Sequence, residues 1–313
     1  MIAMLMKSGL QLVLLLLIAP FISGVIKTLK ARLQTRRGPS PLQPYRDLFK
    51  LLRKGMVIPD TASWIFSATP YIVFVTATLV GLMIPMAATD APLSLFGGVL
   101  AVVYLLALGR FFLALGGLDA GSSFGGLGSS REMTISAIAE PAMMLAIFTV
   151  ALGANSTNLS EMAKSALSQS WKFLAPSQML AFAALFIVLI AETGRIPVDN
   201  PATHLELTMI HEAMILEYSG PYLALIEWGA SIKQLVLMTL LVNTFFPFGL
   251  SSEWSASGLG LGLAFYLFKL LLLACSIVLV ETTNAKMRLF RVQELLAVAF
   301  ILGALALIST FLF

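Results

Sequence analysis

The feature that most constrains this chain is a series of long apolar runs with few or no charged residues. Runs of about 18 to 26 residues recur, and each can cross a hydrocarbon layer about 30 Å thick as a helix rising about 1.5 Å per residue. Of the 313 residues, 58% are hydrophobic and only 12% are charged, which excludes an ordinary soluble domain. The sequence therefore predicts an all-α polytopic membrane protein.

We expect about eight transmembrane helices in a single transmembrane domain covering residues 1–313. The predicted spans are 9–29, 68–88, 95–118, 133–154, 173–193, 222–246, 259–281 and 293–313. The fifth is the weakest, because Pro176 lies near its start and its uncharged stretch is short. An amphipathic helix over 203–218 is predicted in the cytoplasmic loop after the fifth span. The first run leads into Lys27 without a small-residue cleavage site, which predicts a retained helix rather than a signal peptide.

The distribution of basic residues predicts the orientation of the chain. Fourteen Lys and Arg residues lie in the loops after spans one, three, five and seven, whereas Lys7, Lys164 and Lys172 lie on the opposite side. Basic loops stay on the cytoplasmic side, so both termini are predicted outside, in the cell's inner (cytoplasmic) membrane. The net charge of +4 follows from this asymmetry and predicts no nucleic-acid partner.

The loop after the first span contains an amphipathic stretch, Tyr45–Lys54. Its apolar residues, such as Phe49 and Leu52, alternate with Arg46, Lys50 and Arg53. Two interpretations remain open for this stretch. It is either a lipid-headgroup anchor or a docking surface for a peripheral subunit.

The Gly- and Ser-rich stretch Gly116–Glu132 is predicted to be the loop between spans three and four. It lacks the spacing of a phosphate-binding loop, and no strand precedes it. It is therefore either a flexible connector or a close-packed surface against another subunit, presenting Asp119, Arg131 and Glu132.

Ionisable residues also fall inside the predicted spans, where an unpaired charge costs about 2.5–3.5 kcal/mol. They are Arg110, Glu140, Glu192, Glu227, Lys233, Lys269 and Glu281. Several of these lie near span ends, from which a long side chain can reach the interface. Lys233 and Lys269 lie near mid-span. Glutamates and lysines in such positions are what a proton relay needs.

The segment Glu192–Gly220 concentrates acidic residues and both histidines in a chain that is otherwise mostly hydrocarbon. Thr203 to Glu206 fits a capping box, which gives Glu206 a structural explanation. His204 and His211 are seven residues apart, which is not the spacing of a helical zinc site, so no metal is expected. The only cysteine excludes disulfides and iron–sulfur ligation by this chain.

Several motifs resemble those of one membrane-protein family. RRGP at Arg36–Pro39 precedes YRDLFKLL, and AETGRIPVD at Ala191–Asp199 precedes EYSG at Glu217–Gly220. In this order they resemble the membrane-anchor subunit that respiratory complex I (its H-type, or subunit 1, protein) shares with group 4 membrane-bound NiFe hydrogenases, including formate hydrogenlyase. The resemblance covers the whole chain. The stretches Gly109–Glu132 and Trp228–Gln234 are more similar to the hydrogenase branch.

The resemblance implies a non-catalytic membrane subunit that binds no cofactor itself and contacts a peripheral arm with iron–sulfur clusters and a NiFe centre. Expected partners are peripheral hydrogenase-like and iron–sulfur subunits, antiporter-like membrane subunits and the lipid bilayer, with quinone left open. Motif position and burial give an expected proton path of Glu140, Glu192, Asp199, Glu206, Glu212, Glu217, Glu227, Lys233, Lys269 and Glu281. The residues expected to dock the peripheral arm are Arg36, Arg37, Arg46, Asp119, Arg131, Glu132 and Arg195.

Three functions remain open from the sequence. The first is an anchoring and coupling subunit of an energy-converting hydrogenase complex that moves protons or another cation. The second is the quinone-site-forming H-type subunit of complex I. The third, from another class, is a stand-alone proton- or cation-coupled transporter.

Overall fold

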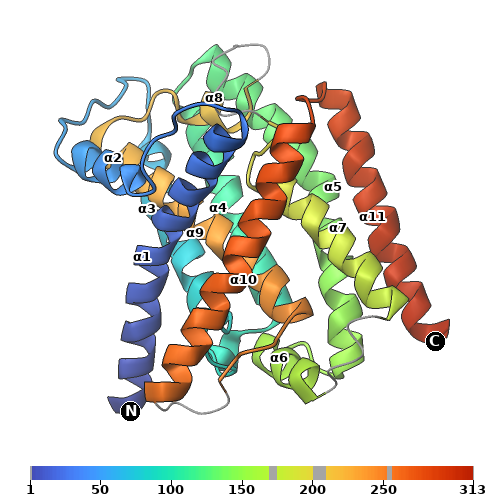
Figure 1. Ribbon diagram of the computed structural model, residues 1–313. Helices are drawn as coiled ribbons and strands as arrows, with labels where there is room; N and C mark the ends of the chain where they lie inside the picture. The colour runs from blue at the N-terminus through green and yellow to red at the C-terminus, as the bar shows by residue number, and fades with distance from the viewer. Residues whose placement is uncertain (1, 169–174, 200–208, 252–255, 313) are drawn as a thin grey trace.

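In the part of the chain that the structure describes, eight long helices form the body of the protein (Figure 1). A computed structural model describes residues 2–168, 175–199, 209–251 and 256–312. The long helices are α1 (Ile2–Leu33), α3 (Trp64–Met83), α4 (Val99–Asp119), α5 (Ser123–Ala154), α7 (Pro176–Glu192), α9 (Gly220–Phe245), α10 (Ala256–Thr283) and α11 (Leu289–Leu312). Shorter elements are α2 (Gln43–Leu52), the 3-10 turn η1 (Ser94–Phe96), α6 (Leu159–Ser168) and α8 (His211–Ile215).

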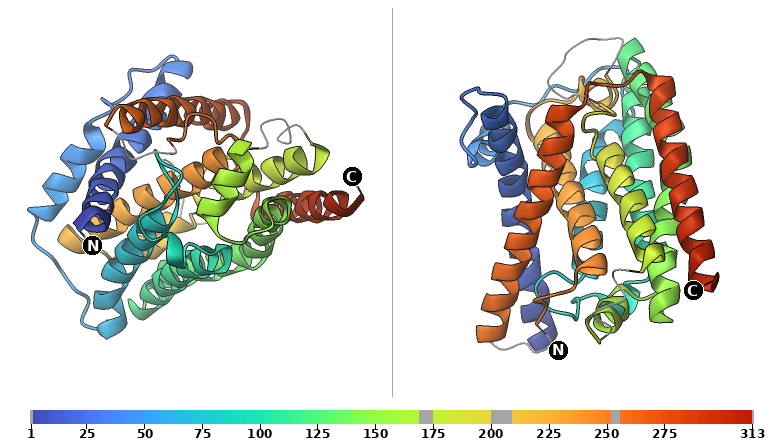
Figure 2. Two further views of the ribbon diagram at one scale, coloured as in Figure 1. Left: turned by 90° about the horizontal axis from the view of Figure 1, so that it is seen from below. Right: turned by 45° about the vertical axis from the view of Figure 1, so that its right-hand side comes forward.

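The helices have the lengths and composition that a bilayer requires. Seven of the described helices are long and apolar enough to cross a membrane. The eighth, α7, has 17 residues and extends about 26 Å, slightly less than the hydrocarbon thickness. The predicted fold class, an all-α polytopic membrane protein, is confirmed. Both termini lie at the same end of the bundle, which we call the far end; α2 and α8 lie at the other, the basic end (Figures 1 and 2).

Helix α9 is the central element of the bundle. Every residue from Gln234 to Phe245 is buried, which is expected only for a helix surrounded on all sides. It packs against α1, α3, α7 and α10. On one side of it, α11 packs on α5 and α7, and on the other side α10 packs on α1. Polar side chains in this stretch, such as Gln234 and Asn243, are therefore enclosed by protein on every side.

The stretch Gly116–Glu132, predicted as a loop, is helical except for a short turn between α4 and α5. Its glycines allow close approach of backbones rather than flexibility. A Cβ at Gly125 would lie 2.1 Å from the carbonyl oxygen of Gly117, and one at Gly128 would lie 2.9 Å from Ala213 of α8. The stretch packs within the chain, and small residues commonly permit such close packing between membrane helices.

The helix predicted over 203–218 is shorter than expected. Helix α8 covers only His211–Ile215, Met209 and Ile210 are not helical, and residues 203–208 lie outside the described part of the chain.

A stacked aromatic pair fixes the chain directly after α8. Tyr218 lies with its ring centroid 4.0 Å from that of Phe66, and its hydroxyl donates to the Phe66 carbonyl at 3.2 Å. Burial raises the pKa of the Tyr218 hydroxyl above its ordinary value, so the group stays a neutral donor.

The close contact between α4 and α5 leads to a stability prediction. Gly125→Ala should lower the free energy of unfolding by about 1–3 kcal/mol, because the new methyl group overlaps the Gly117 carbonyl and forces the helices apart. Thermal unfolding of the detergent-solubilised protein measures this change.

Gly126→Ala is the matched control for this prediction. A Cβ at position 126 contacts only the side chain of Leu118, at 4.0 Å. The thermal unfolding midpoint of this variant should therefore stay near that of the wild type. Equal midpoints for the two variants would show that this helix contact is not tight.

Candidate functional site

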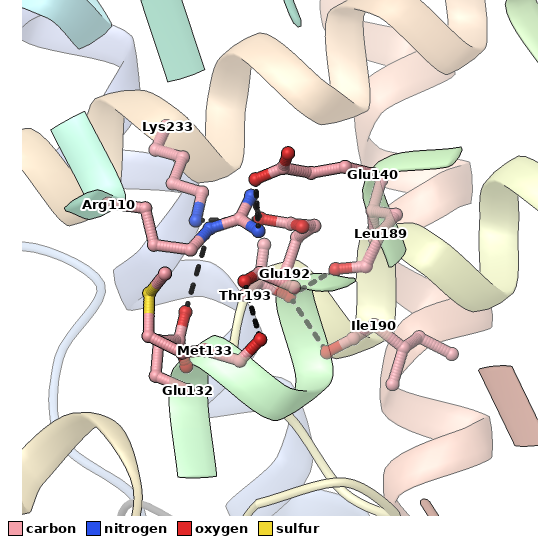
Figure 3. Close-up of polar contacts among 10 residues, drawn as sticks. Arg110, Glu132, Met133, Glu140, Leu189, Ile190, Glu192, Thr193 and Lys233 are labelled. Atoms are coloured by element: carbon pink, nitrogen blue, oxygen red, sulfur yellow. Dashed lines mark hydrogen bonds and ion pairs between the residues drawn. The ribbon is translucent and has the colours of Figure 1, made fainter. Parts of the chain in front are cut away.

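Arg110 of α4 lies at the centre of a group of carboxylates from two other helices (Figure 3). Its Nη2 is 2.6 Å from Oε2 of Glu192, its Nη1 is 3.1 Å from Oε1 of Glu140, and its Nε is 3.7 Å from Oε1 of Glu132. Lys233 of α9 approaches the same Glu192 oxygen, with its Nζ at 2.8 Å. We call these five residues the Arg110 cluster.

The Arg110 cluster contains more acid than base. If all five members are ionised, three carboxylates face two cations, which leaves a formal charge of −1. The side chains of Arg110 and Glu192 are each 3% exposed, whereas that of Glu140 is 31% exposed. Buried charges persist only when paired, so Arg110 compensates charge that these helices could not otherwise retain.

A second group of ion pairs surrounds Arg195, just beyond the end of α7. Its Nη1 is 2.9 Å from Oε1 of Glu281, and its Nη2 donates to Oε1 of Gln234 at 2.9 Å. Lys30 of α1 lies 2.9 Å from the other oxygen of Glu281, and Ser23 also donates to Gln234, at 3.0 Å. This Arg195 cluster has two cations and one carboxylate, a formal charge of +1.

The two clusters meet on the central helix. Lys233 belongs to the Arg110 cluster and Gln234 to the Arg195 cluster, and they are consecutive residues of α9. One set of polar contacts joins α4, α5, α7 and α9, and the other joins α1, α9, α10 and the loop after α7; the backbone of α9 connects the two sets. We call this connected set the polar band. Its formal charges sum to zero, with the excess acid on one side and the excess base on the other.

The sequence at the end of α7 places Glu192 and Arg195 in different clusters. Gly194 has a φ of +57°, its N–H donates to the Ala191 carbonyl, and the Arg195 N–H donates to the Ile190 carbonyl. These contacts form a Schellman motif, in which the left-handed residue is usually glycine. The motif turns the chain sharply after Glu192, so the carboxylate and the guanidinium reach separate clusters.

A cavity of about 190 Å³ adjoins the polar band. It lies among α1, α3, α4, α5, α7, α8 and α9, and both clusters contribute to its wall. Further ionisable groups line it: Lys27, Asp199, His211, Glu212 and Glu227. The cavity has enough room and polar partners to hold water beside the buried carboxylates.

Asp199 is held in place at the edge of this cavity. Its Oδ1 is 2.6 Å from Nζ of Lys286, in the loop between α10 and α11, and its Oδ2 accepts from the Ile210 N–H at 3.2 Å. Asp199 thereby connects the loop after α7 to the segment entering α8.

The remaining residues of the expected proton path lie apart from the band. Lys269 of α10 donates to Oδ1 of Asn243 and to the Phe246 carbonyl, at the far end of α9. A cation there interacts favourably with the helix terminus. Glu217 is exposed and does not line the cavity. Glu206 and His204 lie outside the described residues.

The expected docking residues divide into exposed and internally bonded groups. Arg36, Arg37 and Arg46 are exposed at the basic end. Asp119 accepts from the backbone N–H groups of Ser63 and Phe66, at 2.7 and 3.1 Å, and thereby caps α3. The other three bind within the chain: Arg131 to the Met209 carbonyl, and Glu132 and Arg195 within the two clusters.

Several residues of the polar band are absent from the expected path. Arg110 carries the clearest signal, a charge inside an apolar run, but the sequence does not indicate its partners. Lys30 is one of several basic residues near the first loop, and nothing in the sequence distinguishes it. Ser23 and Gln234 are uncharged, and their only signal is a polar side chain within a span.

Comparisons with known proteins place this chain in a family. A family model described as NADH dehydrogenase matches residues 6–312. Hydrogenase-4 component C of Escherichia coli (strain K12) is 36% identical over 95% of this chain and 92% of the relative. The chain belongs to the NADH dehydrogenase subunit 1 family.

Other similar proteins come from both branches of the NADH dehydrogenase subunit 1 family. Formate hydrogenlyase subunit 4 of Escherichia coli (strain K12) is 36% identical over 89% of this chain and 90% of the relative. The H-type subunit of the NADH-quinone oxidoreductase of Syntrophotalea carbinolica is 31% identical over 90% and 87%. A chain in the structure of the membrane-bound sulfane sulfur reductase, an archaeal respiratory membrane complex, has the same fold, with a TM-score of 0.86 at 19% identity over 98% and 99%.

The geometry predicts that Arg110 stabilises the fold. Arg110→Gln should cost about 3–5 kcal/mol, because it leaves three carboxylates with Lys233 as their remaining partner in the cluster. Adding Glu192→Gln should recover part of this loss, because it removes the most buried of these charges. Thermal unfolding of the single and double variants measures the coupling, and strictly additive losses would contradict it.

Proposed function

We propose that this chain is the integral membrane subunit of an energy-converting, hydrogenase-type oxidoreductase complex. It anchors the peripheral redox arm and couples electron transfer to the translocation of protons. The observation that carries this proposal is the polar band, two buried ion-pair clusters that meet at consecutive residues of the central helix in an otherwise apolar bundle. The 36% identity to hydrogenase-4 component C and formate hydrogenlyase subunit 4 supports the type of complex.

The charge distribution of the band suits a proton relay. The Arg110 cluster has one carboxylate too many, and Glu140, which is its most exposed carboxylate and among the described residues pairs with Arg110 alone, is the most accessible to a proton. A proton on this side removes the excess negative charge there. Because the Arg195 cluster carries an excess of one positive charge, the electric field between the two clusters then weakens. A change of charge at a redox centre near the basic end can alter the same electric field and thereby shift the proton.

The cavity gives this relay an entrance from the basic end. Its wall carries Asp199, Glu212 and Glu227 beside Glu192 of the band, and water within it can carry protons to the carboxylates. From Glu192 the path continues to Lys233 and across α9 to Arg195 and Glu281. Glu206 and Glu217 belong to the proposed mouth of this path by their place in the sequence.

The proposed surroundings follow from the basic end of the bundle. We place this end on the cytoplasmic side of the cell's inner membrane, with both termini outside, because basic loops stay in the cytoplasm. Peripheral hydrogenase-like and iron–sulfur subunits would bind there near Arg36 and Arg37, and would hold the NiFe centre and the iron–sulfur clusters. Antiporter-like membrane subunits would continue the path laterally.

A quinone-reactive subunit of the complex I type is the second candidate. The cavity favours it, because its wall combines apolar side chains with His211 and the charged groups of the band. Redox assays of the purified complex separate the candidates: quinone reduction supports this one, and hydrogen evolution supports the hydrogenase type.

The band predicts which of two mid-span lysines moves protons. In the intact complex, Lys233→Met should reduce redox-driven proton translocation at least tenfold while electron transfer and assembly persist, because Lys233 is the α9 partner of Glu192 on the proposed path and directly precedes Gln234 of the Arg195 cluster. Lys269→Met is the matched control, since it removes the same charge from a site outside the band. Proton movement into vesicles, measured with a pH-sensitive dye, reports both. Equal losses, or no loss with Lys233→Met, would contradict the proposed path.

A further inference from the structure

Helix α2 has a surface that neither the polar band nor the cavity uses. Leu48 faces the bundle and is buried, while Phe49 is 57% exposed and Leu52 and Leu42 are exposed beside it. At 100° per residue, these three exposed apolar residues form one flank of the helix. Arg46, Lys50 and Arg53 are all exposed and continue the surface around the side that faces away from the bundle.

The apolar flank and the basic side of α2 meet in a defined contact. The guanidinium carbon of Arg53 lies 4.1 Å from the centroid of the Phe49 ring, in a cation–π arrangement. Asp47 is the only acid on the helix, and it accepts a hydrogen bond from Gln43 at 2.9 Å. The surface therefore presents positive charge directly beside exposed hydrocarbon.

Contacts with α1 place α2 near the depth of the membrane boundary. The Tyr45 hydroxyl donates to the Leu17 carbonyl, and a Cβ at Gly24 would overlap the Pro41 carbonyl. Leu17 lies 16 residues before Leu33, the last residue of α1, which is a rise of about 24 Å. It lies about 22 Å from Ile2, the first residue of the helix. A hydrocarbon layer about 30 Å thick that starts at residue 9, where the first span is predicted to begin, reaches residue 29 and includes both Leu17 and Gly24. Helix α2 thus runs beside the outer part of the bilayer and not above it.

An exposed tryptophan supports the same depth. Trp64 begins α3 at the basic end, and it is 70% exposed. Tryptophan is enriched where a membrane helix leaves the hydrocarbon. Helix α2 therefore lies at the basic end, at the boundary between the lipid headgroups and the acyl chains.

We propose that α2 is a binding surface for an anionic phospholipid. Arg46, Lys50 and Arg53 bind the phosphate and the charged headgroup, while Phe49 and its apolar flank enter the upper acyl region. Arginine pairs well with phosphate oxygens, and the neighbouring hydrocarbon matches the position of acyl chains below them. This assignment removes Arg46 from the surface that docks the peripheral arm, and it does not depend on the proposed function.

Native mass spectrometry of the purified complex tests this assignment with two defined probes. The complex is titrated with phosphatidylglycerol, and with phosphatidylcholine as the neutral probe. Arg46→Gln with Arg53→Gln should weaken phosphatidylglycerol binding by about 25-fold, since each basic residue near an anionic surface contributes about fivefold. Phosphatidylcholine binding should not change.

Arg288→Gln with Arg291→Gln is the matched control, because it removes the same charge from exposed arginines near the start of α11, also at the basic end. Equal binding of phosphatidylglycerol by the α2 variant and the wild type would overturn the proposal. So would equal weakening by the two double variants, which would indicate a diffuse charge effect.

A second measurement reports the depth of α2 and distinguishes lipid from a protein partner. Phe49→Cys in a Cys275→Ser background is labelled with a polarity-sensitive dye in nanodiscs of phosphatidylglycerol and phosphatidylcholine. An apolar emission in the chain without peripheral subunits supports insertion into lipid. An aqueous emission that becomes apolar only when the peripheral subunits bind would assign α2 to protein docking and overturn the proposal.

Discussion

The ion pair between Arg110 and Glu192 is the interaction on which the architecture of this protein depends. Both side chains are almost fully buried, and their closest atoms are 2.6 Å apart. An isolated charge in hydrocarbon would be neutralised or would draw water toward it. Helices α4 and α7 must therefore stay together, and through Glu140 and Lys233 the same requirement extends to α5 and α9.

Close backbone packing makes this arrangement of charges possible. Glycines near the end of α4 and the start of α5 let those helices touch, so that Arg110 and Glu132 face each other across their contact. The Schellman motif after α7 turns the chain between Glu192 and Arg195, so these two residues, three apart in sequence, enter different clusters. Adjacent residues of α9, Lys233 and Gln234, then hold two clusters of opposite excess charge beside one another.

Much of the fold follows from the sequence alone, because apolar runs of spanning length leave few alternatives. The sequence also indicates where charge enters those runs, which identifies Glu140, Glu192 and Lys233. It does not indicate partners, since the two residues of a pair such as Lys30 and Glu281 are far apart in the chain. The assignment of Gly116–Glu132 to a loop is wrong for a related reason: glycine serves both turns and close helix contacts, and only the neighbouring helix distinguishes the two.

The two mid-span lysines illustrate the same limit. By position and surroundings in the sequence, Lys233 and Lys269 are equivalent. In the structure, Lys233 pairs with Glu192 in the Arg110 cluster, whereas Lys269 donates to the Phe246 carbonyl at the end of α9. Burial of a charge thus predicts that a partner exists, and only the fold determines whether that partner is another ionisable group or the end of a helix.

The central claim is that a proton taken up by the Arg110 cluster passes through Glu192, so that Glu192 changes its protonation when the proposed complex turns over. Redox-induced infrared difference spectroscopy of the intact complex measures this directly, because carboxyl and carboxylate groups absorb separately. The account predicts a carboxyl signal on reduction that disappears in Glu192→Gln. The signal should persist in Glu161→Gln, which changes a side chain on α6 that is 57% exposed. An identical difference spectrum in the wild type and in Glu192→Gln would contradict it.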